Sequence, residues 1–321
     1  MTSSERVAAA VADSVIEWFA LNARPLPWRA ADTSPWGVLV SEFMAQQTPV
    51  ARVAPQWQSW IHRWPRPSAL AAASTADVLN AWDRLGYPRR ALRLHATAAA
   101  IAHEHDDEVP QSYGQLRALP GVGDYTAAAV LAFAFGRRAI VLDTNIRRVV
   151  SRVFAGQGIP RAHIIRAERA LIDGVIPGSA TPENPNPLDE VAAQWSAAVM
   201  ELGALVCTPT PNCTVCPLQR QCSWRAANYP ESVHQPRKSQ PFHGTDRQMR
   251  GRIMKALRDA WPIAVSAAVL CNLVRHADGP ANETPFAQYE RALASLLTDG
   301  LVEKTKGGQV SLPTSSPMNT D

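Results

Sequence analysis

The stretch Leu119-Pro-Gly-Val-Gly-Asp-Tyr-Thr-Ala127 lies between two segments with helical hydrophobic periodicity, and its interpretation decides the fold. Glycines at 121 and 123 allow a tight turn whose amide N–H groups point outward from the start of the next helix. Such a turn can hold one phosphate, so it predicts a helix-hairpin-helix that contacts nucleic acid through Gly121, Val122 and Gly123. A tight turn between two core helices is the alternative interpretation of Gly-x-Gly alone.

Helical periodicity extends over most of the chain. Apolar residues recur at spacings of three and four, alanine adds helix propensity, and strand-type alternation is nearly absent before residue 226. The predicted helices span residues 7–21, 38–47, 75–85, 89–105, 125–135, 145–154, 188–206, 246–260 and 289–299. Two short strands are predicted around Gly307-Gly308, so the C-terminal part is similar to a small winged helix. The sequence therefore predicts an all-α protein with a winged-helix-like C-terminal domain.

The composition restricts the class of protein. The chain has 321 residues, enough for about two or three domains, and its 32 basic and 28 acidic side chains permit nucleic-acid binding. It has no apolar run of transmembrane length and no signal-type N-terminus, so we expect a cytoplasmic protein without a membrane partner. The four lysines are Lys238, Lys255, Lys304 and Lys306, so residues 1–237 contain none.

Four of the five cysteines lie within sixteen residues, as Cys207, Cys213, Cys216 and Cys222 in the spacing C-x5-C-x2-C-x5-C. In a reducing compartment, bunched thiols more often ligate a metal than form disulfides. Zinc sites usually present two tight C-x2-C pairs, and this segment has one, whereas its longer loops suit the bulkier [4Fe-4S] cubane. The spacing predicts a metal site and favours iron–sulfur, with zinc as the alternative. Cys271 is expected to be a buried core thiol.

Two carboxylates form the candidate catalytic pair. Glu42 lies in the apolar run from Val38 to Met44, where burial would let it hold a proton near neutral pH; a surface position on an amphipathic helix is the alternative. Asp143 stands just before the predicted helix 145–154, where helix N-capping is the commonest role of an aspartate. Cleavage of a glycosidic bond needs one acid to protonate the leaving group and one carboxylate to face the oxocarbenium-like sugar.

Six motifs occur together, in order, over residues 24–222: Leu26-Pro-Trp-Arg29, Ser41-Glu-Phe-Met-Ala-Gln-Gln-Thr48, Leu85-Gly-Tyr87, Leu119-Pro-Gly-Val-Gly123, Leu142-Asp-Thr-Asn-Ile-Arg-Arg-Val149 and Glu201-Leu-Gly-Ala-Leu-Val-Cys207. As a set they resemble the adenine DNA glycosylases of the MutY type, which belong to the endonuclease III superfamily. The resemblance implies a two-domain helix-hairpin-helix glycosylase fold with a DNA-binding cleft between the domains and a [4Fe-4S] cluster in the second. It also implies a substrate, double-stranded DNA with adenine opposite 8-oxoguanine (or guanine).

The resemblance assigns roles to individual residues. Glu42 would protonate adenine, Asp143 would stabilise or trap the oxocarbenium ion, and Tyr125 and Asn145 would support them. Tyr87 would enter the base stack as adenine is flipped out, because the glycosidic bond is not accessible inside a stacked duplex. The remaining candidate contacts to adenine, to the oxidised guanine or to the DNA are Arg24, Leu26, Trp28, Arg29, Gln46, Gln47, Thr48 and Leu85.

The same resemblance predicts the domain boundaries. They are an entry segment at 1–28 that packs on the cluster domain, a six-helix domain at 29–140, the cluster domain at 141–226, a linker at 227–245, the winged-helix-like domain at 246–312, and a disordered tail at 313–321.

Two departures and two alternatives remain. Family members usually have C-x6-C as the first cysteine spacing, so ligation by Cys207 is the least certain, and many carry a Nudix-like domain that residues 246–312 are too short and too helical to form. Bifunctional relatives place a Schiff-base lysine where this chain has Tyr125, so the chemistry is expected to be monofunctional. A thymine (T·G) mismatch glycosylase of the same fold is the second candidate. A non-catalytic iron–sulfur DNA-binding protein is the third.

Overall fold

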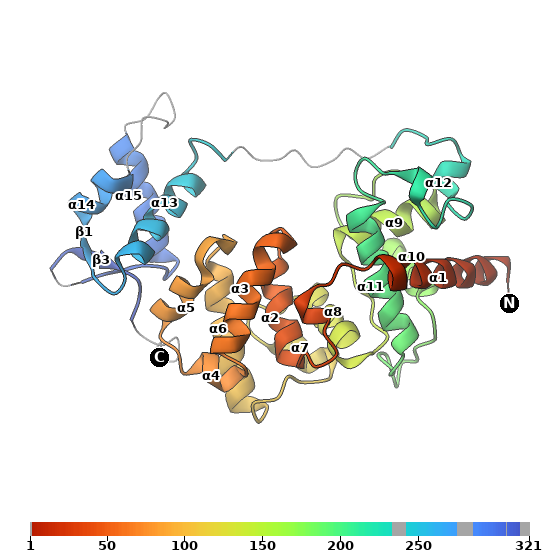
Figure 1. The fold of residues 1–321 in the computed structure, drawn as a ribbon, viewed down its shortest axis with the longest axis horizontal. Helices are drawn as coiled ribbons and strands as arrows, with labels where there is room; N and C mark the ends of the chain where they lie inside the picture. The colour runs from red at the N-terminus through yellow and green to blue at the C-terminus, as the bar shows by residue number, and fades with distance from the viewer. Residues whose placement is uncertain (1, 233–241, 275–284, 306, 315–321) are drawn as a thin grey trace. The chain divides into compact units, whose positions relative to one another are not determined.

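The computed structural model describes residues 2–232, 242–274, 285–305 and 307–314. The described chain is mostly helical (Figure 1), as the sequence predicts. None of the described helices is long and apolar enough to cross a membrane. The predicted disordered tail at 313–321 and part of the predicted linker lie largely outside the described residues.

Each of the nine predicted helices coincides with an observed one. These are α1 (Ser3–Asn22), α2 (Pro35–Ala45), α5 (Thr75–Trp82), α6 (Arg89–Glu104), α8 (Asp124–Phe135), α9 (Thr144–Ala155), α11 (Glu190–Leu205), α13 (Asp246–Ala260) and α15 (Pro285–Thr298). The structure adds α3 (Val50–Arg63), α4 (Pro67–Ala71), α7 (Tyr113–Ala118), α10 (Arg166–Val175), α12 (Ser223–Ala226), α14 (Ala267–Val274) and the 3-10 turns η1 (Pro27–Arg29), η2 (Asp83–Leu85) and η3 (Cys213–Val215).

Contacts divide the chain into two units that differ from the predicted domains. Unit 1 contains Met1–Glu42, Pro110–Ala118 and Val122–Lys238, and unit 2 contains Phe43–Val109, Leu119–Gly121 and Ser239–Asp321. The predicted six-helix domain is thus shared between the units, and the winged-helix-like tail groups with its α3–α6 part. The predicted boundaries themselves stay a prediction.

In unit 1 the long helix α11 is the central element. It contacts α1, α8 and α9, and its residues Trp195, Val199 and Leu202 are at most 1% exposed. The N-terminal helix α1 therefore packs against the helix that leads into the cysteine segment. A capping box, in which the Thr2 hydroxyl and the Glu5 carboxylate each accept a backbone N–H, begins α1.

Unit 2 has two parts. In the first, α4 and α5 pack on α6, and the rings of Trp60, Trp64 and Trp82 form edge-to-face pairs with centroids 4.8 and 5.5 Å apart. In the second, α13, α14 and α15 pack together beside a three-stranded antiparallel sheet in the order β1-β3-β2, from β1 (Val265–Ser266), β2 (Glu303–Lys304) and β3 (Gln309–Ser311). The predicted hairpin is β2–β3, and the winged-helix-like arrangement is confirmed.

The helix-hairpin-helix is formed by α7, the turn at 119–123 and α8. Gly121 has a φ of +75°, a left-handed conformation that favours glycine, and a Cβ there would lie 2.7 Å from the Cβ of Arg93. Val122 is buried, whereas Gly121 and Gly123 are exposed. Gly123 caps α8 without a side chain, so the first amide groups of α8 have no side-chain acceptor from their cap.

Candidate active site

Helix α2 carries Glu42 near its C-terminal end, on a face that includes the fully buried Leu39. Glu42 is 8% exposed, and its burial raises the pKa of the carboxyl to about 7. The Tyr125 hydroxyl donates a hydrogen bond that favours the ionised form, the nearby Asp143 charge opposes ionisation, and Arg29 favours it. The surface alternative for Glu42 is therefore wrong, and the group is poised to hold or release a proton near neutral pH.

Asp143 is the N-cap of α9, which is the role that its position before the predicted helix favours. Its Oδ1 accepts the backbone N–H of Ile146 at 2.6 Å, and its Oδ2 accepts Nδ2 of Asn145 at 3.0 Å. Burial nevertheless raises the pKa of Asp143, because desolvation outweighs these hydrogen bonds. The same side chain therefore caps α9 and lies near Glu42. The cap fixes the carboxylate at the start of α9, where its charge raises the pKa values of Glu42 and Tyr125.

A buried arginine connects Asn145 to the cysteine segment. Arg148 donates from Nη2 to Oδ1 of Asn145 and to the carbonyl of Gly203, both at 2.7 Å, and from Nε to the carbonyl of Cys207 at 2.7 Å. A Cβ at Gly203 would lie 2.6 Å from the Cβ of Asn145, so only glycine allows α11 to approach α9 this closely. Arg148 and Gly203 both lie within the recognised motifs, but neither was assigned a role from the sequence.

A charged network in unit 1 surrounds Glu201, whose side chain is 0% exposed. Arg24 donates to it from Nε at 2.7 Å, from Nη2 at 2.8 Å and from its backbone N–H at 3.0 Å, and Arg29 donates from Nη2 at 3.0 Å. Burial opposes ionisation of Glu201, but these donors outweigh it and lower the pKa to about 2. Glu201 therefore fixes Arg24 and Arg29, the two arginines that the family resemblance predicts as contacts to adenine. Leu26 and Trp28, from the same segment, are half-buried at η1.

In unit 2, Arg90 organises the segments 46–48 and 85–87. Its Nη1 donates to the carbonyl of Gln46 at 2.6 Å, and its Nη2 donates to Oγ1 of Thr48 at 2.9 Å and to the carbonyl of Leu85 at 3.0 Å. The Thr48 hydroxyl in turn donates to Leu85 at 2.9 Å, so Thr48 and Leu85 are buried structural partners. No role was assigned to Arg90 from the sequence. Its place among the apolar residues on the buried face of α6 is the pattern that could have marked it as a buried structural arginine.

Gln47 and Tyr87 lie at the exposed tips of these two segments. Their φ angles are 55° and 47°, in the left-handed region that non-glycine residues rarely adopt. Tyr87 is 40% exposed despite its size. Strained, exposed side chains on a rigid support are typical of positions that contact a ligand. The candidate residues are thus distributed over both units: Gln46, Gln47, Thr48, Leu85, Tyr87 and Gly121 belong to unit 2, and all the others to unit 1.

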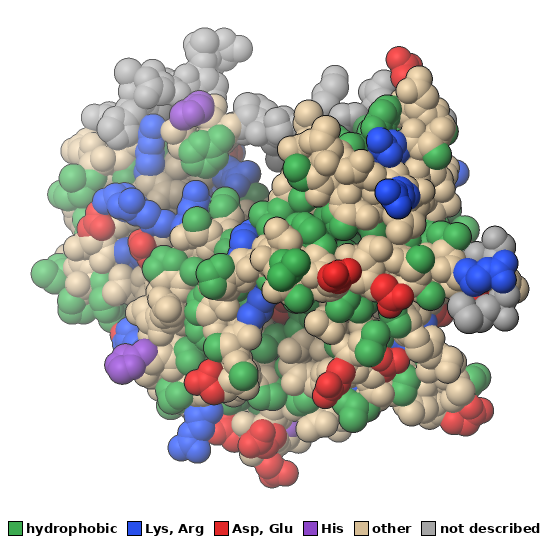
Figure 2. All heavy atoms as spheres, turned by 45° about the vertical axis from the view of Figure 1, so that its right-hand side comes forward, with side chains coloured by type: hydrophobic (Ala, Val, Ile, Leu, Met, Phe, Trp, Pro, Cys, Tyr) green, Lys and Arg blue, Asp and Glu red, His purple; other side chains and the backbone are tan. Residues whose placement is uncertain are grey.

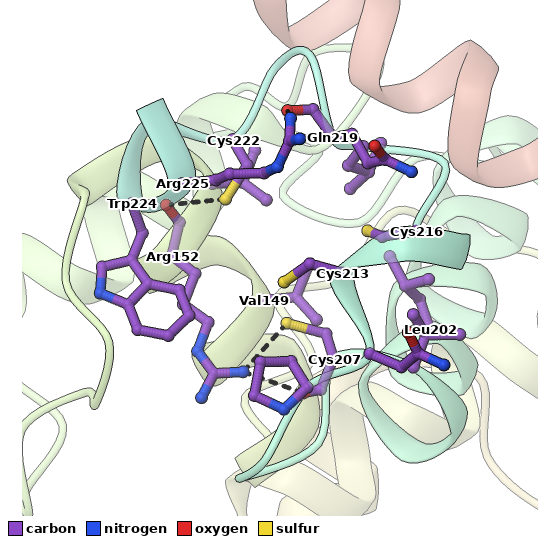
Figure 3. A pocket seen from close by; sticks show the side chains of 15 residues that line it. Val149, Arg152, Leu202, Cys207, Cys213, Cys216, Gln219, Cys222, Trp224 and Arg225 are labelled. Atoms are coloured by element: carbon purple, nitrogen blue, oxygen red, sulfur yellow. Dashed lines mark hydrogen bonds between the residues drawn. The ribbon is translucent and has the colours of Figure 1, made fainter. Parts of the chain in front are cut away.

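The four clustered cysteines line one pocket in unit 1, together with Val149, Leu202 and Leu218. All four are free thiols, and Figure 3 shows their side chains around a common space, with Arg152 at its edge. Arg152 donates from Nη1 to Sγ of Cys207 at 3.3 Å and to the carbonyl of Thr208 at 2.7 Å. Across the described ranges, no three His, Cys, Asp or Glu side chains are arranged to hold a metal ion. The four thiols surround a pocket and do not converge on the position of a single metal ion. Cys271 is buried in the tail, as expected.

Comparison with known proteins defines the class first. Residues 40–172 match the family described as HhH-GPD superfamily base excision DNA repair protein. The fold is similar to that of a thermostable thymine-DNA glycosylase, with a TM-score of 0.61 and 22% identity over 70% of this chain and all of that chain. It is also similar to endonuclease III in a non-covalent DNA complex, with a TM-score of 0.56 and 21% identity over 71% of this chain and 99% of that chain. The helix-hairpin-helix glycosylase fold is confirmed.

Closer relatives define the family. An adenine DNA glycosylase of Mycobacterium tuberculosis strain H37Rv is 47% identical over 94% of this chain and 92% of that protein. One from Mycolicibacterium smegmatis is 45% identical over 93% of this chain and 94% of that protein. The human adenine DNA glycosylase is 35% identical over 66% of this chain and 39% of the human protein. The chain belongs to the adenine DNA glycosylase family, whose members are enzymes of base excision DNA repair.

Proposed function

We propose that the protein removes adenine mispaired with 8-oxoguanine, or with guanine, from double-stranded DNA, as a monofunctional glycosylase acting as a monomer in the cytoplasm at the nucleoid. The observation that carries the proposal is the buried Glu42, whose pKa of about 7 leaves it protonated in a large fraction of molecules at neutral pH. An aspartate and a tyrosine accompany it, Asp143 and Tyr125. One proton donor beside one carboxylate is the division of labour that glycosidic cleavage needs.

In the proposed mechanism, the flipped adenine enters between these groups. Glu42 gives its proton to a ring nitrogen of adenine, which makes the base a neutral leaving group. As the bond to the sugar breaks, positive charge develops on the sugar ring, and the Asp143 carboxylate stabilises it or forms a transient covalent bond. Asn145 fixes Oδ2 of Asp143, and Tyr125 holds the Glu42 carboxyl. Glu42, ionised after the first step, then accepts a proton from the attacking water.

The adenine-facing residues would be Arg24, Leu26, Trp28 and Arg29. The network at Glu201 supports the two arginines, because hydrogen bonds to an ionised carboxylate hold both guanidinium groups in place before a base binds. The apolar Leu26 and Trp28 would contribute stacking and exclude water.

Contacts to the opposite strand would come from unit 2. Gln47 and Tyr87 are the exposed residues of these segments that a base could contact, with Gln46 as a further candidate, since Thr48 and Leu85 are held by Arg90 and each other. Thr48 and Leu85 would act by supporting the segments at 46–48 and 85–87. Gly121, Val122 and Gly123 would offer backbone N–H groups to one phosphate. Recognition of 8-oxoguanine would therefore rest on the catalytic module, because the tail is winged-helix-like.

No Schiff base can form at the catalytic position, because the residue there is Tyr125 and residues 1–237 contain no lysine. The product should be an intact strand with an abasic site, and alkali should be needed to cleave it.

The cysteine pocket fits a [4Fe-4S] cluster held by Cys207, Cys213, Cys216 and Cys222. Four free thiols around one volume supply the required donor set, and Arg152 brings an N–H donor to one sulfur. When bound, the cluster would cross-link the loops at 207–222. Arg148, bonded to both Cys207 and Asn145, would then steady the start of α9. Iron and sulfide should each be present at about four atoms per chain. Both contents should fall in Cys207→Ser, and both should stay at the wild-type level in the matched control Cys271→Ser. Zinc in their place would contradict the assignment.

The test of the function uses three duplexes with adenine opposite 8-oxoguanine, adenine opposite guanine, and thymine opposite guanine. The protein is added, then alkali, and strand cleavage is followed on a gel. We expect cleavage of both adenine duplexes and none of the thymine duplex. Cleavage of the thymine duplex alone would favour the mismatch-thymine alternative. No cleavage of any duplex by an iron-loaded protein that still binds DNA would favour the non-catalytic alternative.

A further inference from the structure

A basic groove runs along unit 2 where α13 of the tail lies beside the segment from η2 to the start of α6. Eight of its eighteen lining residues are arginine or lysine, and one, Asp83, is acidic. Basic side chains gather on the left of Figure 2, the side that carries α13 to α15 in Figure 1. Of the residues that line this groove, the proposed function uses Tyr87 and assigns no role to the basic side chains.

Ion pairs join the two walls of the groove. Asp299 pairs with Arg250 of α13 at 2.6 Å and with Arg89 of α6 at 3.4 Å. Asp83 lies 4.0 Å from Arg258. These carboxylates balance part of the positive charge and connect α13, and the residue that follows α15, to the η2–α6 segment.

Four arginines of the groove keep an unbalanced charge. Within the residues that the structure describes, Arg52, Arg84, Arg247 and Arg252 have no acidic partner within 4.0 Å. Arg52 and Arg84 are even adjacent, with Nη1 of Arg52 donating to the carbonyl of Arg84 at 3.5 Å. Like charges collected on one surface repel one another, so an anion that bridges them would be bound with a gain in free energy.

The groove also reaches the candidate wedge residue. The guanidinium of Arg247 lies over the Tyr87 ring, 4.5 Å from its centroid, and 5.7 Å from the centroid of Phe242. The tail thereby contacts the side chain that would enter the base stack.

Gly251 gives a second, independent sign of a ligand. It lies within α13, where glycine costs about 1 kcal/mol relative to alanine, and it lines the groove. A Cβ at this position would meet nothing within 4 Å, so packing within the protein does not require glycine. A bare backbone at the surface of a basic groove suits the close approach of an extended polyanion.

We propose that this groove binds the phosphate backbone of duplex DNA, so that the winged-helix-like tail extends the DNA-binding surface and holds the strand beside Tyr87. The inference rests on the proposed function in taking DNA as the ligand. Phosphates at regular spacing match a row of arginines, and Arg247 would couple their binding to the position of Tyr87.

The experiment measures affinity for an undamaged duplex of 25 base pairs, at several salt concentrations, with the full-length protein. The variants are Arg84→Ala, Arg252→Ala and the double variant; neither side chain has an acidic partner, so folding should be retained, and thermal unfolding checks this. Each lost phosphate contact should reduce the slope of log affinity against log salt by about 0.9. Between 50 and 200 mM salt, the wild-type affinity should therefore fall about 12-fold more than that of the double variant.

Lys304→Ala is the matched control, because Lys304 is an exposed basic residue of the same tail outside the groove. Its slope should equal that of the wild type. An unchanged slope in the double variant, or an equal reduction in Lys304→Ala, would overturn the proposal. Because the duplex carries no mismatch, the result is independent of excision: a wild-type protein that fails to excise adenine refutes the proposed function and leaves this test intact.

Discussion

Replacement of Tyr125 by phenylalanine should move the alkaline limb of the pH–rate profile to higher pH. In the wild type, Glu42 has a pKa of about 7, so its protonated fraction at pH 8 is about one tenth. The Tyr125 hydroxyl lowers this pKa by donating to the ionised carboxylate. Removal of a hydrogen bond to a charged group costs about 1.5–3 kcal/mol, which raises the pKa by about 1–2 units.

The assay is single-turnover excision of adenine opposite 8-oxoguanine with enzyme below saturation, from pH 6 to pH 9, with each profile normalised to its own plateau. The wild-type rate should fall about tenfold from its plateau by pH 8, because the proton donor is lost as pH rises through the pKa of Glu42. Tyr125→Phe should retain about half or more of its plateau rate at pH 8. Tyr125 itself does not contribute to the limb, since burial raises its pKa well above 10.

Tyr113→Phe is the matched control. It removes a hydroxyl from the neighbouring helix α7 that donates to Asp124 at 2.9 Å, away from Glu42, so its limb should coincide with that of the wild type. A limb in Tyr125→Phe that stays in place or moves to lower pH would refute the assignment of the limb to a Glu42 held by Tyr125.

Three further changes test the supports of the site. Asp143→Asn should reduce excision by roughly 10²–10³-fold while DNA affinity persists, and because asparagine also caps helices, the free energy of unfolding should change by less than about 1 kcal/mol; loss of folding would contradict this. Glu201→Gln should lower the free energy of unfolding at pH 7 by at most about 3–5 kcal/mol, since it removes the buried carboxylate that pairs with two half-buried arginines. The folded-state pKa of Glu201 is depressed to about 2, so its stabilisation is present above its usual pKa near 4.5 and is lost as pH falls toward 2; urea titrations over that range should show this slope in the wild type and lose it in the variant. Gly203→Ala should cost about 1–3 kcal/mol and slow excision, because its Cβ would lie 2.6 Å from Cβ of Asn145, whereas Gly251→Ala, with open space at its Cβ, should not destabilise in thermal unfolding.

The positions of helices were predictable where apolar spacing and helix propensity agreed. The prediction failed where the two disagreed. Helix α3 was not predicted, because Pro55 lies inside it and removes a backbone donor. Its buried residues Val53, Trp57 and Trp60 nevertheless follow helical spacing, and burial of two tryptophans outweighs one lost hydrogen bond. Strand β1 was not predicted either, because its two residues pair with a strand distant in sequence and show no local alternation.

The candidate site divides in the same way. The apolar neighbours of Glu42 predicted its burial and a proton near neutral pH, because that environment is local in sequence. The partners of Glu201 and Arg90 were not predictable, since they depend on contacts 177 and 42 residues away, as in the bonds from Arg24 to Glu201 and from Arg90 to Thr48. A motif can mark such a residue as part of a pattern without showing which groups it contacts.

Two buried glutamates in unit 1 show how the same desolvation has opposite results. Both carboxyls lose water, which alone would raise both pKa values. Glu201 receives two guanidinium groups at hydrogen-bond distance and stays ionised, whereas Glu42 receives a neutral hydroxyl and a more distant influence from Arg29. Because Arg29 is committed to Glu201, it cannot form a close ion pair that would hold Glu42 ionised. The network at Glu201 therefore does more than shape a pocket: by occupying the arginines, it leaves Glu42 free to keep the proton that the proposed chemistry requires.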